Sequence, residues 1–359
     1  MNINVKLLKE ICEIAGAPGH EQRVRELVLR EVKKLADKVS IDNMGNVTAF
    51  KKGTASSKAK SDGEKKDKKV MIAAHMDEIG FIVTHIDENG FLRFTPLGGF
   101  DPKTLTAQRV IVHGKKDVIG VMGSKPIHMM SPSEREKVVP INDYFIDLGM
   151  NKKEVEKIIS VGDTITRERE LIEMGNCVNC KSIDNRVSVF ILIEMLRELK
   201  TSPYDVYAVF TVQEEVGLRG ANASALQIQP DFGFGLDTTI AYDVPGAKAS
   251  EMITKLGDGT AIKIMDASTI CDYRMVKFMK QTATKHKIKH QMELLTAGGT
   301  DTAALQRMTP GGSISGAISI PTRHIHQVIE MADKSDIRAS IDLLKHCIQD
   351  IDKFDWSFK

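Results

Sequence analysis

The apolar positions near the start of the chain follow first a helical and then an extended period. Between residues 7 and 37, apolar residues recur every three or four positions on both sides of a Gly-Ala-Pro-Gly break, so we expect two amphipathic helices there. Apolar runs at 39–41 and 47–50 flank the turn signal Asp-Asn-Met-Gly at 42–45, which predicts a pair of strands. The first 50 residues therefore predict two helices followed by a strand pair.

In the second half of the chain, apolar runs alternate with helical patterns. Uninterrupted apolar runs are typical of inner strands in a sheet whose faces are both covered. We expect strands at 206–212, 232–236, 291–295 and 317–320, the last strand of the chain, and helices at 187–199, 218–226, 273–286 and from residue 335 onward. An earlier run, 70–74, predicts one more inner strand. The alternation predicts an α/β fold with a mixed central sheet flanked by helices.

Residues 78–167 differ in texture, because short β runs separated by glycine turns replace the α/β alternation. No long helical pattern occurs before residue 152. The β runs are at 80–86, 90–95, 109–112 and 118–122. We interpret this segment as a small inserted domain that resembles a β barrel. It would divide the α/β domain into a first part, residues 1–77, and a second part, residues 168–359.

The segment 53–69 contains almost nothing apolar, and Lys, Ser and Gly dominate it. Such a segment buries too little area to offset the entropy of ordering it, so we expect a flexible surface loop. A basic interaction patch is the alternative, although Asp62, Glu64 and Asp67 dilute its charge.

Composition narrows the classes of function. The 359 residues carry a net charge of +2, with 42% apolar and 27% charged residues, as in an ordinary globular protein. These totals give no electrostatic support for a nucleic-acid or membrane partner, and we expect neither. There is no run of eighteen apolar residues and no signal-peptide pattern at the start. Five cysteines, a small and odd number, fit a reducing compartment, so we expect a cytoplasmic protein.

Acidic residues and a histidine follow three of the predicted strands. Glu214 and Glu215 follow one strand, His75 ends a second, and Asp237 ends a third. Adjacent carboxylates repel, and each resists burial unless a cation or a proton compensates its charge. Because ligands gather at the carboxyl ends of the strands in open α/β sheets, we expect these side chains to meet.

Asp184, Asp77 and His326 complete the candidate set. Asp184 precedes the helix at 187–199, where it would be either a helix N-cap or a carboxylate that bridges two cations. Asp77 stands two residues after His75, and a carboxylate in this position can orient a metal-binding imidazole. His326 follows the last predicted strand.

The candidate ligands indicate which metals would suit them. Imidazoles and carboxylates suit zinc, cobalt or manganese. Two ions about 3.5–4 Å apart need a bridging carboxylate, further ligands for each ion and a shared water. The candidate set supplies these ligands and leaves one carboxylate free as a general base. Cys177 and Cys180 lack a second ligand pair at zinc-finger spacing, so we interpret them as structural.

Six segments resemble, in the same order, those of the tetrahedral-assembly metallo-aminopeptidases, which are family forty-two of the dinuclear metallopeptidases. The segments are AHMDEIGF at 74–81, KSIDNR at 181–186, QEEVGLRGA at 213–221, GLDTTIAYDVPG at 235–246, GGTDTAALQ at 298–306 and IPTRHIHQ at 320–327. The family contains glutamyl, leucyl and lysyl aminopeptidases, and the resemblance covers nearly the whole chain. The charged segment at 53–69 resembles an insertion relative to typical members.

The resemblance implies two divalent metal ions per subunit, with zinc or cobalt favoured and manganese as an alternative. Asp184 would bridge the two ions. His75 and Asp237 would complete one metal site. Glu215 and His326 would complete the other.

The resemblance also implies roles for residues that do not bind metal. Glu214 would be the general base, and Asp77 would orient His75. His324 stands where many members have an aromatic residue. Asn185 stands where many members have a second Asp, a change that would affect the surroundings of the metals rather than the number of ligands.

The activity implied by the resemblance is the removal of N-terminal residues from short peptides. The inserted β domain would help two subunits to dimerise. Members of the family commonly form twelve-subunit tetrahedral particles, so we expect a homo-oligomer, with a dodecamer built from dimers as one form.

Two other functions stay open at this point. An endoglucanase-like glycoside hydrolase would need two carboxylates about 5–9.5 Å apart and no metal. One Trp and 5% aromatic residues are a poor supply of platforms for sugar stacking. A non-catalytic assembly protein that kept the fold would be favoured if ligands were missing, yet every ligand position is filled.

Overall fold

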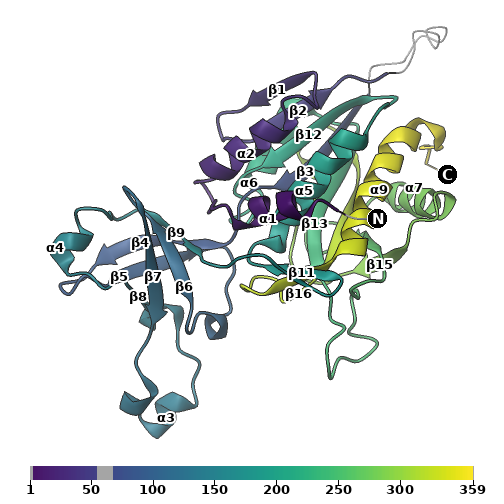
Figure 1. Ribbon diagram of the computed structural model, residues 1–359. Coiled ribbons are helices and arrows are strands. Elements are labelled where there is room, and N and C mark those ends of the chain that lie inside the picture. Colours follow the sequence, from purple (N-terminus) through teal and green to yellow (C-terminus); the bar gives the residue numbers. More distant parts are fainter. Residues whose placement is uncertain (1–2, 55–67, 359) are drawn as a thin grey trace.

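The computed structural model describes residues 3–54 and 68–358, which form an α/β part and a β barrel beside it (Figure 1). The predicted α/β fold with an inserted barrel-like unit is confirmed. Most of the predicted flexible loop at 53–69, namely residues 55–67, lies outside the described residues.

One large mixed sheet forms the centre of the α/β part. Its strands are β1 (Lys38–Ile41), β2 (Val47–Lys51), β3 (Lys69–His75), β10 (Ile172–Met174), β11 (Cys177–Cys180), β12 (Asp205–Thr211), β13 (Phe232–Ile240), β14 (Thr260–Met265), β15 (His290–Leu294), β16 (Ile314–Arg323) and β17 (Glu330–Asp333). Within the described ranges these eleven strands include the order β1-β2-β12-β3-β13-β16-β17-β11-β10, and β14 pairs with β16 and β15. The neighbours β12, β3, β13 and β16 run parallel, so their carboxyl ends lie at one edge.

Helices cover both faces of this sheet, which explains the uninterrupted apolar runs. They are α1 (Val5–Glu13), α2 (Gln22–Val32), α5 (Ile183–Glu198), α6 (Arg219–Ile228), α7 (Tyr273–Lys285), α8 (Thr302–Arg307) and α9 (Lys334–Asp350), which a short 3-10 turn (Ile351–Lys353) follows. The main core packs α1, α2, α5, α7 and α9 on one face, and a smaller core packs α6 and α8 on the other. In β3, Val70, Ile72 and Ala74 face the main core, whereas Met71 and Ala73 face the smaller one.

The barrel closes in the order β4-β5-β8-β7-β6-β9. Its strands are β4 (Gly80–Ile86), β5 (Leu92–Leu97), β6 (Arg109–His113), β7 (Asp117–Gly123), β8 (Phe145–Asp147) and β9 (Thr164–Arg167). Alternate residues, such as Val110 and Val112, fill its interior. The strand that enters the barrel, β4, pairs with the strand that leaves it, β9, so the barrel is a single excursion from the α/β part.

Short helices decorate the barrel. They are α3 (Pro132–Arg135), α4 (Lys152–Val155) and 3-10 turns at Pro102–Thr104, Ile127–Met129 and Ile141–Asp143. Figure 1 shows α3 at the tip of a long excursion between β7 and β8, far from the α/β part.

Two strand predictions were wrong in detail, and β14 was missed. The strand predicted at 232–236 continues as β13 to Ile240, because residues 237–240 pair with β16 although Asp237, Thr238 and Thr239 are polar. The strand at 317–320 is not the last, since the short β17 follows it and pairs with β16 and β11. β14 was not predicted, because Lys263 interrupts its apolar pattern.

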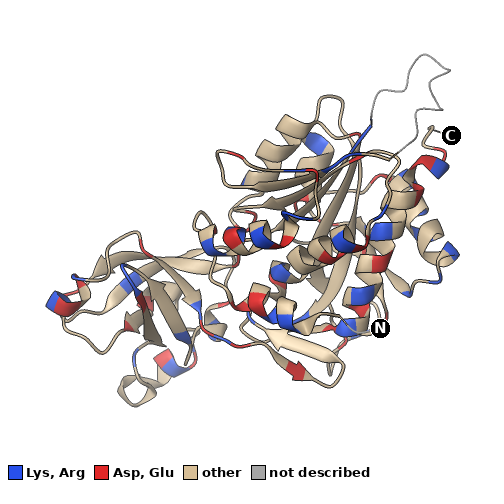
Figure 2. Cartoon of the chain, turned by 45° about the horizontal axis from the view of Figure 1, so that its top comes forward, with Lys and Arg blue, Asp and Glu red and all other residues tan. Residues whose placement is uncertain are grey.

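Charged side chains of both signs are interspersed on the helices and along the barrel (Figure 2). Among residues 3–54 and 68–358, the longest helices are too short or too polar to cross a membrane.

Candidate functional site

The parallel register brings His75, Glu214 and Glu215 to one edge of the sheet. His75 is the last residue of β3, and it pairs with Thr211, the last residue of β12. The chain then continues past Thr211 to the two glutamates. Two strands that end side by side therefore deliver an imidazole and two carboxylates to the same place.

Asp237 and His326 come from the next two parallel strands. β13 pairs with β3 as far as Gly235, which lies opposite Ala73, so Asp237 is level with His75 at the end of β3. His326 follows β16 in a left-handed conformation with φ of 65°. Asp184 reaches the same edge from the start of α5, where its own backbone is not yet helical.

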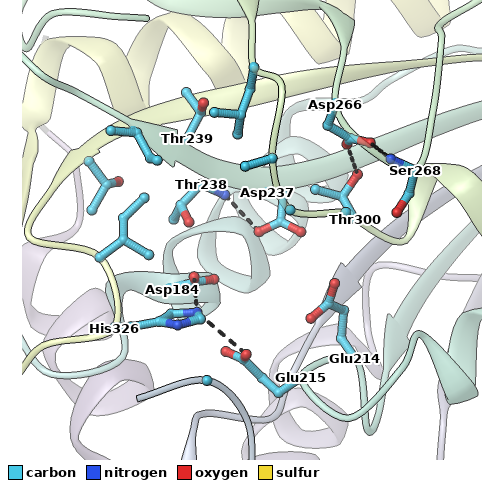
Figure 3. A pocket seen from close by; sticks show the side chains of 18 of the residues that line it. Asp184, Glu214, Glu215, Asp237, Thr238, Thr239, Asp266, Ser268, Thr300 and His326 are labelled. Carbon is cyan, nitrogen blue, oxygen red and sulfur yellow. Dashed lines mark hydrogen bonds and ion pairs between the residues drawn. The ribbon is translucent and has the colours of Figure 1, made fainter. Parts of the chain in front are cut away.

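The structure brings the five predicted metal ligands and Glu214 together. Figure 3 labels Asp184, Glu214, Glu215, Asp237 and His326 of this group. The Nε2 atom of His75 lies 3.4 Å from Asp184 Oδ1 and 3.8 Å from Asp237 Oδ1. On the other side, the Nε2 atom of His326 lies 3.5 Å from Asp184 Oδ2 and 3.5 Å from Glu215 Oε2. The two oxygens of Asp184 thus face two different histidines.

These separations fit metal coordination better than direct hydrogen bonding. Charge-assisted N–H···O bonds are about 2.7–2.9 Å long. Ligand atoms about 2.0–2.2 Å from a tetrahedral zinc-type ion lie roughly 3.3–3.6 Å from one another. Within the described part of the chain, Asp184 Oδ1 is buried and has no hydrogen-bond partner, which is a second sign that a cation belongs beside it.

Three groups of residues could hold an ion, and in each the ligand atoms lie within 4.8 Å of one another. The groups are His75 with Asp184 and Asp237, Asp184 with Glu215 and His326, and His75 with Glu214 and Glu215. The first two share Asp184 and correspond to the two metal sites that the sequence predicts.

The acidic side chains are buried beside one another, which makes their charges costly. Burial, with the charges of Asp237 and Glu215, raises the pKa of Glu214 well above its ordinary value. Burial and the charge of Asp184 raise the pKa of Glu215 to about 7. Burial likewise raises the pKa of Asp237 well above its ordinary value. Without a cation these acids retain protons, and a bound cation would replace those protons.

The pKa values of the two histidines are also raised, although burial acts on an imidazole in the opposite direction. Burial lowers the pKa of His326, but Asp184 and Glu215 outweigh burial and raise this pKa to about 9. The same balance, with Glu214 as the strongest opposing charge, raises the pKa of His75 well above its ordinary value. The paired imidazoles in turn hold the pKa of Asp184 below its usual range despite burial.

Asp77 supports the site mainly through backbone amides. The N–H of Glu214 donates to Asp77 Oδ1 at 3.0 Å, and the N–H of Glu215 donates to Oδ2 at 3.1 Å. The Nδ1 atom of His75 lies 3.0 Å from the backbone carbonyl oxygen of Asp77 and 3.5 Å from its carboxylate. Asp77 therefore contacts His75 through its backbone carbonyl oxygen and fixes the backbone of both glutamates with its carboxylate.

Sequence reasoning missed two acidic residues beside the site. Glu330 is 1% exposed and follows His326 by four residues, but it begins a short strand that no apolar pattern marks. Asp301 is the Asp of the GGTD loop, and the hydroxyl of Thr211 donates to it at 2.5 Å. Burial raises the pKa of Asp301 to about 6. This loop is part of a segment that resembles the family, but no pattern distinguished this side chain.

A cavity of about 650 Å³ opens beside the cluster. Besides the site residues, hydroxyl side chains such as Thr238 and Thr300 and aliphatic side chains such as Ile240 and Leu295 line it. Lys263 and Asp266 also reach it and are paired with each other at 2.9 Å. The cavity has the size of a small-molecule or peptide-end site.

Metallopeptidases are a class of enzyme that uses such a site, in which histidines and carboxylates meet at the carboxyl edge of an α/β sheet. The comparison with family models is specific: the model of the M42 glutamyl aminopeptidases matches residues 55–343. The chain belongs to this family.

Individual relatives agree with the family match. An aminopeptidase from the archaeon Desulfurococcus kamchatkensis superposes with a TM-score of 0.90 and 39% identity, covering 96% of this chain and 94% of its own. The lysyl aminopeptidase of Pyrococcus furiosus is 32% identical over 99% of both chains. The TET1 peptidase of Pyrococcus horikoshii, described as able to assemble into a tetrahedron or a large octahedral shell, has a TM-score of 0.83 and 30% identity over 96% of this chain and 98% of its own.

Proposed function

We propose that this aminopeptidase is a dinuclear metalloenzyme that removes N-terminal residues from short peptides. One observation carries the proposal: the two oxygens of Asp184 face His75 and His326, and each histidine has a second carboxylate beside it. A carboxylate placed in this way suits a bridge between two ions.

The residues divide into ligands and a base. His75, Asp237 and Asp184 would hold one ion, and Glu215, His326 and Asp184 would hold the other, with zinc or cobalt favoured and manganese as an alternative. Two divalent ions, when bound, would supply an acidic water for attack and polarise the scissile carbonyl. Glu214 lies beside this group, and it is the carboxylate that these two sites leave free.

Glu214 is suited to move the proton. Its side chain is 9% exposed and faces the cavity, and its backbone N–H is fixed by Asp77. We assign it the role of accepting a proton from the attacking water and donating it to the leaving amine. The cavity beside it would receive the N-terminal residue of the peptide.

We further propose that the protein works as a homo-oligomer in which the barrel contributes to a dimer contact. Exposed apolar residues on the barrel and on its long excursion support this role, namely Ile119, Val121, Ile127, Met129 and Val138. The assembly of the Pyrococcus horikoshii relative supports a larger particle, with a dodecamer as one form.

Metal removal tests the central proposal. Dialysis against a chelator should abolish hydrolysis of amino-acid amides and anilides, and zinc, cobalt or manganese added separately should restore it at about two ions per subunit. Elemental analysis of the restored protein gives the count. Activity that is indifferent to chelation would reject the metal mechanism. Hydrolysis of a β-glucan under those conditions would favour the glycosidase alternative, and protein that binds no ion would favour the non-catalytic one.

A further inference from the structure

Glu330 connects two metal-ligand residues that are far apart in the sequence. It is the first residue of β17 and is 1% exposed. The backbone N–H of Asp184 donates to Glu330 Oε2 at 2.8 Å, and the backbone N–H of His326 donates to Oε1 at 2.8 Å. Each carboxylate oxygen therefore fixes the backbone of one candidate ligand.

His326 needs such support because its backbone is strained. Its φ of 65° lies in the left-handed region, which is unfavourable for a residue with a Cβ. Glu330 holds its N–H, and the Nη1 atom of Arg167, at the end of β9, donates to its carbonyl oxygen at 3.0 Å. Arg167 is 2% exposed and belongs to the barrel, so the barrel contributes one of the two contacts that pin this residue.

Asp184 is less dependent on Glu330 than His326 is. It begins α5, and the next side chain, Asn185, donates to the carbonyl oxygen of Leu236 at 2.8 Å. His326 lies in the turn between β16 and β17 instead, where Glu330 accepts from its backbone N–H and Arg167 donates to its backbone carbonyl oxygen.

We propose that Glu330, assisted by Arg167, is a positioning residue that sets the geometry of the His326 side of the metal centre. The inference rests on the dinuclear site proposed above. A carboxylate is required because it offers two acceptors to two N–H donors, whereas an amide of the same shape offers one acceptor and turns a donor toward the other N–H. Partners of this kind typically change metal affinity by about 10–100-fold when they are removed.

The test is a calorimetric titration of metal-free protein with zinc, which needs no catalytic readout. The variant Glu330→Gln should bind one ion as the unsubstituted protein does and the other about 10–100-fold more weakly. Glu330→Asp, which keeps two acceptors, should recover part of this loss. Arg167→Gln should lower the affinity for the same ion while leaving Glu330 in place.

Asp336 provides a matched control. It is a fully buried carboxylate that also accepts two backbone N–H groups, from Gly257 at 2.7 Å and Gly259 at 2.8 Å, but it does not line the cavity. Asp336→Asn should lower stability and leave both zinc affinities unchanged.

The outcomes separate this inference from the proposed function. If the unsubstituted protein binds two ions and Glu330→Gln binds both equally well, the positioning role is wrong while the dinuclear site stands. The positioning role would also be overturned if Glu330→Gln lowered the affinity for both ions equally, or if Asp336→Asn lowered zinc affinity by the same factor. If the unsubstituted protein binds no zinc, the dinuclear proposal and this inference fall together. Should Glu330→Gln not fold, Arg167→Gln decides by the same criteria.

Discussion

At the residue scale, Glu214 and Glu215 have different surroundings although they are consecutive in the sequence. Glu215 Oε2 lies 3.5 Å from the Nε2 atom of His326, which fits the ligand role proposed for it. Glu214 Oε2 lies 3.8 Å from the Nε2 atom of His75 and faces the cavity. Asp77 holds both of their amides, so the two side chains leave the backbone in fixed and different directions. One acid can therefore bind metal while its neighbour transfers a proton.

This division predicts contrasting effects for two conservative substitutions. Glu214→Gln should keep both ions and lose about 100- to 10,000-fold in kcat, because an amide cannot accept the proton of the attacking water. Glu215→Gln should instead lose one ion, because a ligand charge is gone. Metal content and kcat are measured on the same preparations. Near-normal turnover by Glu214→Gln would reject this residue as the base.

The sequence predicts the candidate ligands, the candidate base Glu214 and Asp77, and it misses Glu330 and Arg167. Each of the five candidate ligands adjoins an apolar strand or a helix start, so position along the chain marks it as a candidate, and the family resemblance favours His326 over His324. Glu330 and Arg167 act on the backbone of His326 across the tertiary fold. Backbone N–H and C=O groups are the same at every residue, so no sequence pattern marks which of them a distant side chain will bind.

At the element scale, glycines in β13 allow α8 to lie close to the sheet near the cavity. A Cβ at Gly235 would collide with the side chain of Thr302, the first residue of α8, and one at Gly233 would lie 2.9 Å from the Cβ of Leu305. Gly235 is on the same face of β13 as Asp237, and Thr302 directly follows Asp301. Close packing at Gly235 therefore sets the position of two acidic residues.

Alanine at either glycine should overpack the same helix but affect the site differently. Gly235→Ala and Gly233→Ala should each lower the free energy of unfolding by about 1–3 kcal/mol in urea denaturation. Only Gly235→Ala should also lower kcat/KM, by roughly 10–100-fold, because it displaces the start of α8 beside the cavity. Equal loss of kcat/KM in the two variants would show that the effect is general loosening of the fold.

The inner strands and α5 could be predicted because their residues are buried on both faces, and the other long helices because one face of each is buried. α5 is the clearest case, since nearly all of its residues are buried and its sequence from Val187 to Leu196 is apolar except for Ser188 and Glu194. β17 and β14 could not, because their strand state comes from pairing with neighbours rather than from an apolar pattern. Lys263, in β14, is buried only because Asp266 and Glu293 lie 2.9 and 3.3 Å away to compensate its charge.

At the scale of the whole molecule, buried ionisable groups are concentrated at the proposed metal centre, although the net charge of the protein is only +2. In the metal-free state, burial raises the pKa of Glu215 to about 7, and carboxylate neighbours outweigh burial to raise the pKa of His326 to about 9. Both groups bind a proton more tightly in the folded than in the unfolded chain. Protons therefore partly compensate for the missing cations.

This linkage predicts that metal-free protein becomes less stable as pH rises. Protonated Glu215 contributes to the free energy of unfolding. This contribution is fully present below the unfolded pKa of 4.5 and is lost as pH rises to about 7. The contribution of His326 is present below pH 6.5 and is lost as pH rises to about 9. The free energy of unfolding should fall between pH 5 and 9, with Glu215 alone contributing on the order of 3 kcal/mol. Chemical denaturation with a chelator present measures this slope, and Glu215→Gln should reduce it.

Zinc-loaded protein should lose the slope, because ions that replace the protons bind more tightly as the ligands deprotonate. An equal slope with and without zinc would mean that these groups are not where the cations bind.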